Sequence, residues 1–237
     1  MIVDSETLRD AGTRLPDHLA IVARGAIAPA TCARWTSGVL AARQEWTSDF
    51  DGDQFCLGRA FYTHLETDRA DLYFADAEAS DARVERYAPG LQAALRALLE
   101  DAVGGRVVPR AGWCGAGIHV FPSGAPVARE GGVRHFDVEG LADEHLERRA
   151  PAVTLVAMLS PPVRGGGLRL WAVLYEGDDE PDVPPADGAI VELRPGDVVL
   201  LDSYRLHQIQ PFGGDRPRIS ATLHGAAIDA GLWECWF

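Results

Sequence analysis

The chain has 237 residues, of which 47% are hydrophobic and 24% charged; this is the composition of a folded globular protein and excludes a disordered or fibrous one. Its 22 basic residues, all of them arginine, are outnumbered by 35 acidic ones, and the net charge of −13 disfavours binding to nucleic acid or to an anionic membrane. The sequence contains no apolar run long enough for a signal peptide or a membrane span, so we expect a cytoplasmic protein.

Helices are predicted for the first part of the chain, up to about residue 99. Apolar residues recur at intervals of three and four in segments 31–46 and 84–99, which is the pattern of helices that pack one face against a core. Pro89 and Gly90 interrupt the second segment, so the helix there is expected to begin at this point.

From Gly112 onward, short apolar or β-branched runs alternate with glycine and proline, a pattern that predicts the strands of a sandwich or barrel. Two long connections, 123–134 and 176–187, are interpreted as lids or substrate-facing loops. A sheet needs cover on its faces, so we expect a single domain over residues 1–237 in which a helical region, about 1–110, supports a β core, about 111–237. The predicted strands are 116–121, 152–159, 168–175, 189–193, 197–201, 207–210 and 219–223.

A candidate metal site begins with His135 and Asp137. In an extended strand, residues two apart point to the same face, so this imidazole and carboxylate can converge on one ion. His207 is the candidate for a second imidazole. Two histidines and one carboxylate form the facial triad that leaves positions on non-haem iron open for a cosubstrate and dioxygen.

Arg218 and Ser220 follow His207 on the next predicted strand, again two residues apart and on one face. A planar guanidinium beside a hydroxyl is suited to holding a carboxylate through paired hydrogen bonds. The order along the chain is therefore His-x-Asp, then His, then Arg-x-Ser.

This order resembles that of the iron(II)- and 2-oxoglutarate-dependent oxygenase superfamily, in particular its prolyl-hydroxylase-like branch. The segment Gly165-Gly166-Gly167-Leu168 resembles the turn into a mid-barrel strand of that branch, and Pro195-Gly196-Asp197 resembles the turn before the strand that leads to the distal histidine. The resemblance covers about residues 117–223. It implies a mainly β fold, the double-stranded β-helix or jelly roll, buttressed here by the N-terminal α-helices.

The resemblance also implies roles for individual residues. His135, Asp137 and His207 would be the Fe(II) ligands, and Arg218 with Ser220 would hold the distal carboxylate of 2-oxoglutarate. Arg216 is the alternative for this clamp, but it lacks a serine partner and stands between neighbours typical of a solvent-exposed loop.

Relatives often carry a hydroxyl or amide on the strand before His-x-Asp to bond the cosubstrate. Phe121 lacks such a group here, whereas His119 lies on the same strand face and is predicted either to replace it or to be a hydrogen-bonded core histidine. His224 has no partner at ligand spacing, and the aromatic segment 233–237 is expected to be buried against its own domain or a second copy, which leaves a homo-oligomer open.

The expected function is hydroxylation of an unactivated C–H bond in a small molecule, such as a free amino acid or a natural-product intermediate, with dioxygen as co-reactant. Asp137 fills the iron position that a halide would need, so chlorination is not expected. Two alternatives remain: a cupin-like module that binds metal or ligand without turnover, and a cupin dioxygenase that needs no 2-oxoglutarate.

Overall fold

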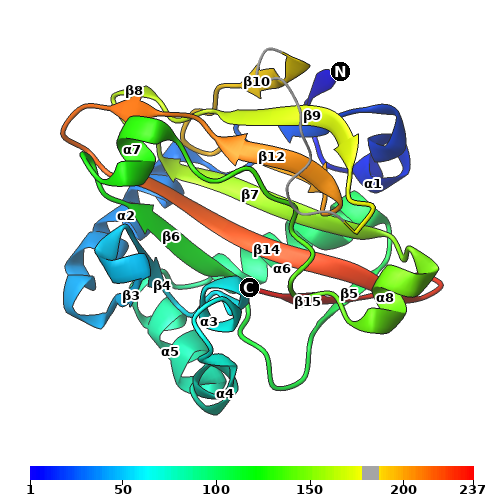
Figure 1. Ribbon diagram of the computed structural model, residues 1–237, viewed down its shortest axis with the longest axis horizontal. Coiled ribbons are helices and arrows are strands. Elements are labelled where there is room, and N and C mark those ends of the chain that lie inside the picture. Colours follow the sequence, from blue (N-terminus) through cyan, green and yellow to red (C-terminus); the bar gives the residue numbers. More distant parts are fainter. Residues whose placement is uncertain (178–186) are drawn as a thin grey trace.

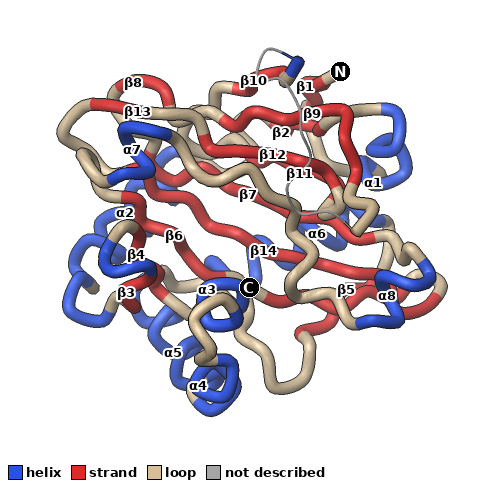
Figure 2. Tube along the Cα trace, viewed as in Figure 1, coloured by secondary structure: helices blue, strands red, loops and turns tan. Residues whose placement is uncertain are grey.

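The centre of the molecule is built from strands (Figures 1 and 2). The computed structural model describes residues 1–177 and 187–237, so most of the predicted loop 176–187 lies outside the described residues. Within the described part, ten strands form a large sheet in the order β1-β2-β11-β7-β14-β6-β4-β3, with β15 pairing along β14 and β5 along β15. These strands are β1 (Ile2–Ser5), β2 (Ala20–Ala23), β3 (Thr47–Asp49), β4 (Gln54–Leu57), β5 (Arg106–Pro109), β6 (Gly117–Phe121), β7 (Ala152–Ser160), β11 (Val198–Asp202), β14 (Arg218–Asp229) and β15 (Leu232–Trp236).

A smaller sheet covers part of the large one. It consists of β10 (Ala189–Val191), β9 (Leu168–Leu174) and β12 (Arg205–Ile209), and a short pair, β8 (Arg164–Gly165) with β13 (Phe212–Gly213), lies at its end (Figure 1). A buried apolar cluster joins the sheets, since it includes Val22 and Val199 of the large sheet and Leu168 and Leu170 of the small one. Two facing sheets around a shared interior form the double-stranded β-helix expected from the sequence.

The three longest helices cover the other face of the large sheet. The longest are α2 (Pro29–Ala41), α5 (Ala77–Tyr87) and α6 (Leu91–Val103), and shorter ones are α1 (Ala11–Arg14), α3 (Phe61–Leu65), α4 (Ala70–Ala75), α7 (Pro126–Glu130) and α8 (Asp143–Arg148). Helix α6 begins directly after Gly90, which has a φ of 78° that favours glycine, and its buried Leu91, Leu95 and Leu99 recur at four-residue intervals. The expected helix start at the Pro89-Gly90 break is therefore observed, and residues 84–87 belong to the preceding helix.

The N-terminal region also contributes strands, which differs from the helical expectation for residues up to about 99. Strand β2 is fully buried and pairs with β11, and β4 pairs with β6. The segment Ala20–Ala23 of β2 is too short and too uniformly apolar to show a helical or an alternating pattern. Pairing with neighbouring strands therefore decides its conformation. No helix among the described residues combines the length and the apolar character of a membrane span.

Candidate active site

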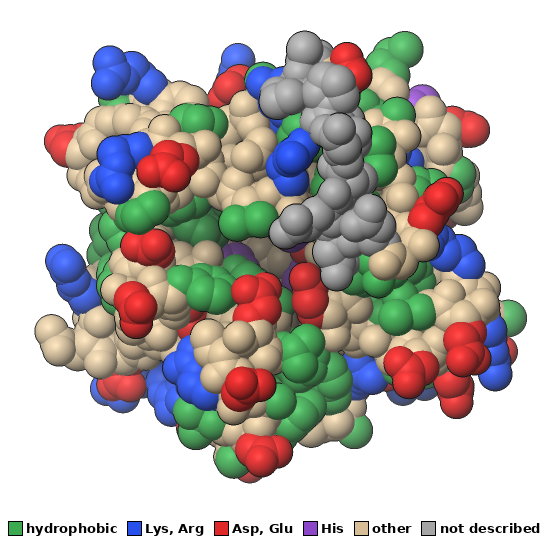
Figure 3. Space-filling model, viewed as in Figure 1, with side chains coloured by type: hydrophobic (Ala, Val, Ile, Leu, Met, Phe, Trp, Pro, Cys, Tyr) green, Lys and Arg blue, Asp and Glu red, His purple; other side chains and the backbone are tan. Residues whose placement is uncertain are grey.

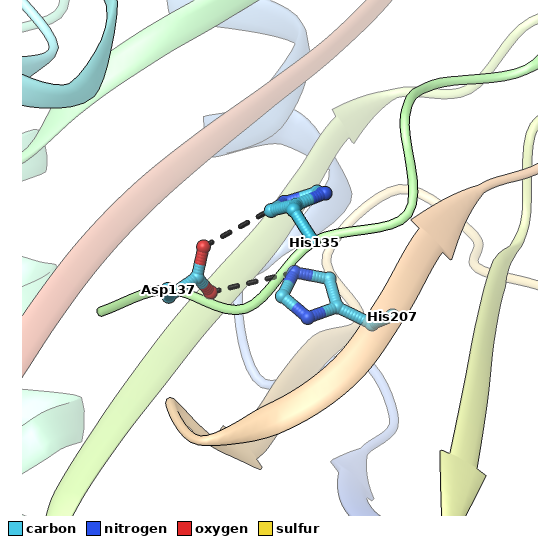
Figure 4. Close-up of side chains that lie close together, drawn as sticks. All are labelled: His135, Asp137 and His207. Carbon is cyan, nitrogen blue, oxygen red and sulfur yellow. Dashed lines mark ion pairs between the residues drawn. The ribbon is translucent and has the colours of Figure 1, made fainter. Parts of the chain in front are cut away.

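His135, Asp137 and His207 meet inside the barrel (Figure 4). His207 lies on β12, while residues 135–137 form an isolated bridge to it rather than the expected continuous strand. The backbone N–H of His135 donates to the His207 carbonyl at 3.1 Å, and that of His207 donates back at 3.0 Å. The N–H of Asp137 donates to the Ser203 carbonyl at 2.8 Å. These backbone bonds bring the three side chains together without a regular strand.

The three side chains have the geometry of a metal site. One ligand atom from each lies within 4.8 Å of the other two, and Nε2 of His135 and of His207 are 3.7 and 3.4 Å from the carboxylate oxygens of Asp137. Nδ1 of His135 donates to the Val133 carbonyl and Nδ1 of His207 to the Arg205 carbonyl, both at 2.9 Å. Because Nδ1 is occupied in both rings, Nε2 carries the lone pair that a metal needs.

The charge states also suit a cation. Burial opposes ionisation of Asp137, but the neighbouring imidazoles of His207, His224 and His135 outweigh it and lower the pKa of this carboxyl to about 2. Burial lowers the pKa of His207 to about 4. Asp137 Oδ2 is buried and has no hydrogen-bond partner in the described part of the chain. An ionised carboxylate with an unsatisfied buried oxygen, the neutral imidazole of His207 and the Nε2 lone pair of His135 together fit a divalent ion such as Fe(II).

Arg218 and Ser220 lie on β14 in the same interior. Arg218 is only 1% exposed, and its guanidinium donates to the Ser220 hydroxyl at 2.9 Å and to the Gly166 carbonyl at 3.0 Å. No acidic side chain pairs with it among the residues that the structure describes. Arg216, the alternative for the clamp, is exposed.

His119 lies beside this pair, because β6 and β14 place it directly opposite Ser220 and place Phe121 opposite Arg218. It is 7% exposed, and burial lowers its pKa to about 3, so it is neutral at physiological pH. Its Nδ1 is 3.2 Å from the Cys56 sulfur, a weak hydrogen bond that holds the ring in place. His119 thus has a core partner on one side and the predicted cosubstrate site on the other.

Several side chains near the triad have no sequence motif of their own. Thr154 on β7 lies beside the Asp137 carboxylate, and its hydroxyl is 3.0 Å from Nδ1 of His224 and 3.1 Å from the Ser203 hydroxyl. His224 is on β14 and shares a small pocket with Asp137 and Glu139. Side-chain alternation along β14 could have predicted the place of His224. Because His224 lies an even number of residues from Arg218, the two side chains share a face of the strand.

The aromatic segment at residues 233–237 forms one wall of this pocket through Trp236 and Phe237, which are 2% and 1% exposed. The Phe237 carbonyl accepts bonds from the Phe61 N–H at 3.0 Å and from the Tyr73 hydroxyl at 2.9 Å. A side-chain carbon at Gly117 would overlap the Phe237 ring, which explains the glycine there. The expectation that this segment is buried against its own chain agrees with these contacts.

A larger cavity of about 850 Å³ lies elsewhere, between the edges of both sheets, and is lined by residues including Ile2, Arg24, Ile190 and Asp197. None of the triad lines it. Arg24 there is already paired with Asp4 at 2.8 Å and with Asp197 at 2.7 Å, so its charge is satisfied. The small pocket lined by Asp137, and not this cavity, adjoins the triad.

Comparisons with known proteins bear on the fold. Neither a scan against protein-family models nor a search of curated proteins gave a match. Among solved structures, the chain is similar to the non-heme alpha ketoglutarate dependent epimerase SnoN from nogalamycin biosynthesis, with a TM-score of 0.58 and 15% identity, covering 92% of this chain and 81% of that one. It is also similar to a prolyl hydroxylase from Trichoplax adhaerens, solved with a hypoxia inducible factor peptide fragment, with a TM-score of 0.54 and 12% identity, covering 90% and 86%. The chain therefore shares its fold with these two enzymes.

Proposed function

We propose that the protein is an iron(II)- and 2-oxoglutarate-dependent dioxygenase that hydroxylates an unactivated C–H bond of a small molecule, such as a free amino acid or a natural-product intermediate. The observation that carries this proposal is the pairing of two sites in one interior. Three side chains that could hold a metal face the same interior as a buried arginine that has no acidic partner among the described residues. A buried charge without a counterion points to an anionic ligand.

Each part of the site has a role in this reaction. His135, Asp137 and His207 would hold Fe(II), and Arg218 with Ser220 would hold the distal carboxylate of 2-oxoglutarate. His119 would contact the cosubstrate from the neighbouring strand. When bound, the metal and cosubstrate supply the oxidising chemistry, in which dioxygen, 2-oxoglutarate and a C–H bond give succinate, carbon dioxide and a C–OH bond. The barrel walls orient the reactants and exclude water.

The alternatives fit the site less well. A binding module, or a cupin dioxygenase without 2-oxoglutarate, has no use for the buried Arg218 and its Ser220 partner, whose charge costs folding stability. If the triad holds a metal, the carboxylate of Asp137 would fill the position that a halide needs, which supports hydroxylation over chlorination.

The test is a screen of small molecules for succinate release by the Fe(II)-loaded protein, with parallel reactions that lack 2-oxoglutarate. We expect one class of compound to stimulate succinate formation and to leave as a product heavier by one oxygen atom. A product lighter by two hydrogens would indicate desaturation or ring closure, and one of unchanged mass would indicate epimerisation, so either would refute hydroxylation. Metal binding without any 2-oxoglutarate binding would refute the dioxygenase proposal and favour a binding module.

A further inference from the structure

The small pocket that adjoins the triad is narrow. Its volume of about 20 Å³ admits a group the size of one water molecule, and Asp137 is part of its lining. In Figure 3, histidine atoms are visible at the bottom of a hollow on this face. The lining also includes four aromatic side chains, Phe61, Tyr62, Trp236 and Phe237. These rings therefore limit how much of a substrate can lie beside the triad.

Phe237 lies where the pocket meets the predicted cosubstrate site. Its ring centroid is 4.8 Å from that of His119, and His119 stands opposite Ser220 in the large sheet. The same ring lines the pocket that reaches Asp137. The Phe237 ring thus forms a boundary between the part of the interior that contains the triad and the part predicted to hold 2-oxoglutarate.

Two glycines leave room for this ring. A side-chain carbon at Gly117, on β6, would lie 2.0 Å from two of the ring atoms, and one at Gly58 would lie 3.7 Å from the ring. Because neither glycine has a side chain, neither can fill the space that the ring occupies. A smaller side chain at position 237 would therefore leave an empty space that is continuous with the pocket.

The backbone of Phe237 is held by bonds that do not involve the ring. Its N–H donates to the Cys114 carbonyl at 3.0 Å. Its carbonyl accepts from the Phe61 N–H at 3.0 Å and from the Tyr73 hydroxyl at 2.9 Å. Loss of the ring should therefore enlarge the pocket without releasing this segment of the chain.

We propose that Phe237 determines substrate specificity in the candidate active site. Its ring closes the pocket on the cosubstrate side, so that a slender, unbranched part of the substrate can lie beside Asp137 and a cyclic or branched group cannot. The inference rests on the proposed function, because it specifies the shape of the substrate at that same site. The C–H bond that is oxidised would then belong to a methyl or methylene group of an unbranched chain. The selectivity depends on shape and not on the charge of any group in the pocket.

The test compares hexan-1-ol with cyclohexanol, in which the same number of carbon atoms is closed into a ring. Binding is measured by ligand-observed NMR on the protein loaded with Mn(II) and 2-oxoglutarate under nitrogen, with a Zn(II)-loaded sample as the diamagnetic reference. Mn(II) broadens the signals of a probe that binds close to the triad. The wild type should bind hexan-1-ol about tenfold more tightly than cyclohexanol or better.

Three variants assign this preference to Phe237. Phe237→Ala should reduce it to less than about threefold, because the space left by the ring accommodates cyclohexanol. Phe237→Leu keeps most of the buried volume, so it should fold even if Phe237→Ala does not, and it should give an intermediate preference. Phe55→Ala is the matched control. Phe55 lies on β4 but packs on the opposite face, with its ring centroid 5.6 Å from that of Trp46, so its loss should leave the preference unchanged.

Four results would each refute the role of Phe237. They are equal binding of the two alcohols by the wild type, binding of neither, a preference that stays the same in both Phe237 variants, and the same loss in Phe55→Ala. Probe signals that Mn(II) does not broaden would place the bound alcohol away from the triad and would refute it as well.

The experiment also separates this inference from the function on which it rests. Titration of Mn(II) and 2-oxoglutarate into the wild type tests the proposed function without any alcohol. Normal binding of both, without a preference for hexan-1-ol, would overturn the role of Phe237 alone. A preference that depends on Phe237, in a protein that binds Mn(II) but no 2-oxoglutarate, would overturn the proposed dioxygenase and leave the shape selectivity of the pocket standing.

Discussion

Replacement of Arg218 by methionine should leave stability almost unchanged and weaken cosubstrate binding. Methionine approximates the length of the side chain without its charge. In the folded chain the guanidinium is almost fully buried and is bonded only to the neutral Ser220 hydroxyl and Gly166 carbonyl. A residue retained purely for folding would pair such a charge with a carboxylate, whereas a binding residue would leave it for the ligand.

The magnitudes follow from the same contacts. Burial lowers the pKa of Arg218 from its ordinary 12.5 to about 10, which corresponds to a penalty on the order of 3 kcal/mol for the charged form. Its hydrogen bonds to Gly166 and Ser220 each return about 1–2 kcal/mol. The penalty and the two bonds nearly cancel, so the free energy of unfolding of the ligand-free variant should lie within about 1 kcal/mol of the wild type's. Loss of the bond to the 2-oxoglutarate carboxylate should weaken binding by about 30-fold or more.

Urea unfolding with and without Mn(II) and 2-oxoglutarate measures both effects. The cosubstrate should raise the unfolding midpoint of the wild type and leave that of Arg218→Met almost unchanged. Arg216→Met is the matched control, because Arg216 is exposed and lies two residues away, and it should behave as the wild type. The reasoning fails if Arg218→Met lowers the free energy of unfolding by more than about 2 kcal/mol while 2-oxoglutarate still stabilises it.

Three further predictions concern the triad and its supports. His207→Ala should abolish metal binding, measured by iron content, and normal iron with continued succinate production would contradict the triad. Thr154→Val should weaken metal affinity by about tenfold or more and Thr154→Ser should restore it, whereas equal affinities would show that the hydroxyl does not position Asp137. The Asp197 carboxylate is 4% exposed, and burial raises its pKa, but hydrogen bonds from Arg194, Arg24 and Gly25 lower the pKa by more. The ionised group therefore stabilises the fold above its unfolded pKa, and this stabilisation is lost as the pH falls through the lower folded pKa. Asp197→Asn should therefore cost about 1–3 kcal/mol at pH 7 and less below about pH 3 in urea unfolding, and a cost independent of pH would contradict this.

The strands of the barrel were predictable because each has a clear pattern bounded by turn residues. The predicted segment 152–159 matches β7, and 168–175 matches β9 within a residue. The triad was also predictable, although for a partly different reason: residues 135–137 converge through a bridge to β12, not through a regular strand. The side chains meet because the backbone is extended enough on both sides of that bridge.

Other parts of the structure could not be predicted from local sequence patterns. Strand β14 runs to Asp229, well past the predicted end at residue 223, because its second half pairs with β15. This pairing across a turn brings His224 beside Trp236, with ring centroids 6.2 Å apart, and thereby forms the pocket. No sequence motif predicts this pocket, because its lining comes from helix α3, the segment that begins at Asp137, and two strands.

Strand β14 organises both the site and the core because its side chains alternate. Ile219, Ala221 and Leu223 face the helices and belong to the same buried cluster as Leu95 of α6. The intervening residues, from Arg218 through Ser220 to His224, face the interior that contains the triad. Polar groups can occupy this second face because each finds a partner there, as Arg218 does in Ser220 and His224 in Thr154. We therefore expect substitutions at the even positions from 218 to 224 to change ligand binding, and those at the odd positions to change the packing of the sheet against the helices.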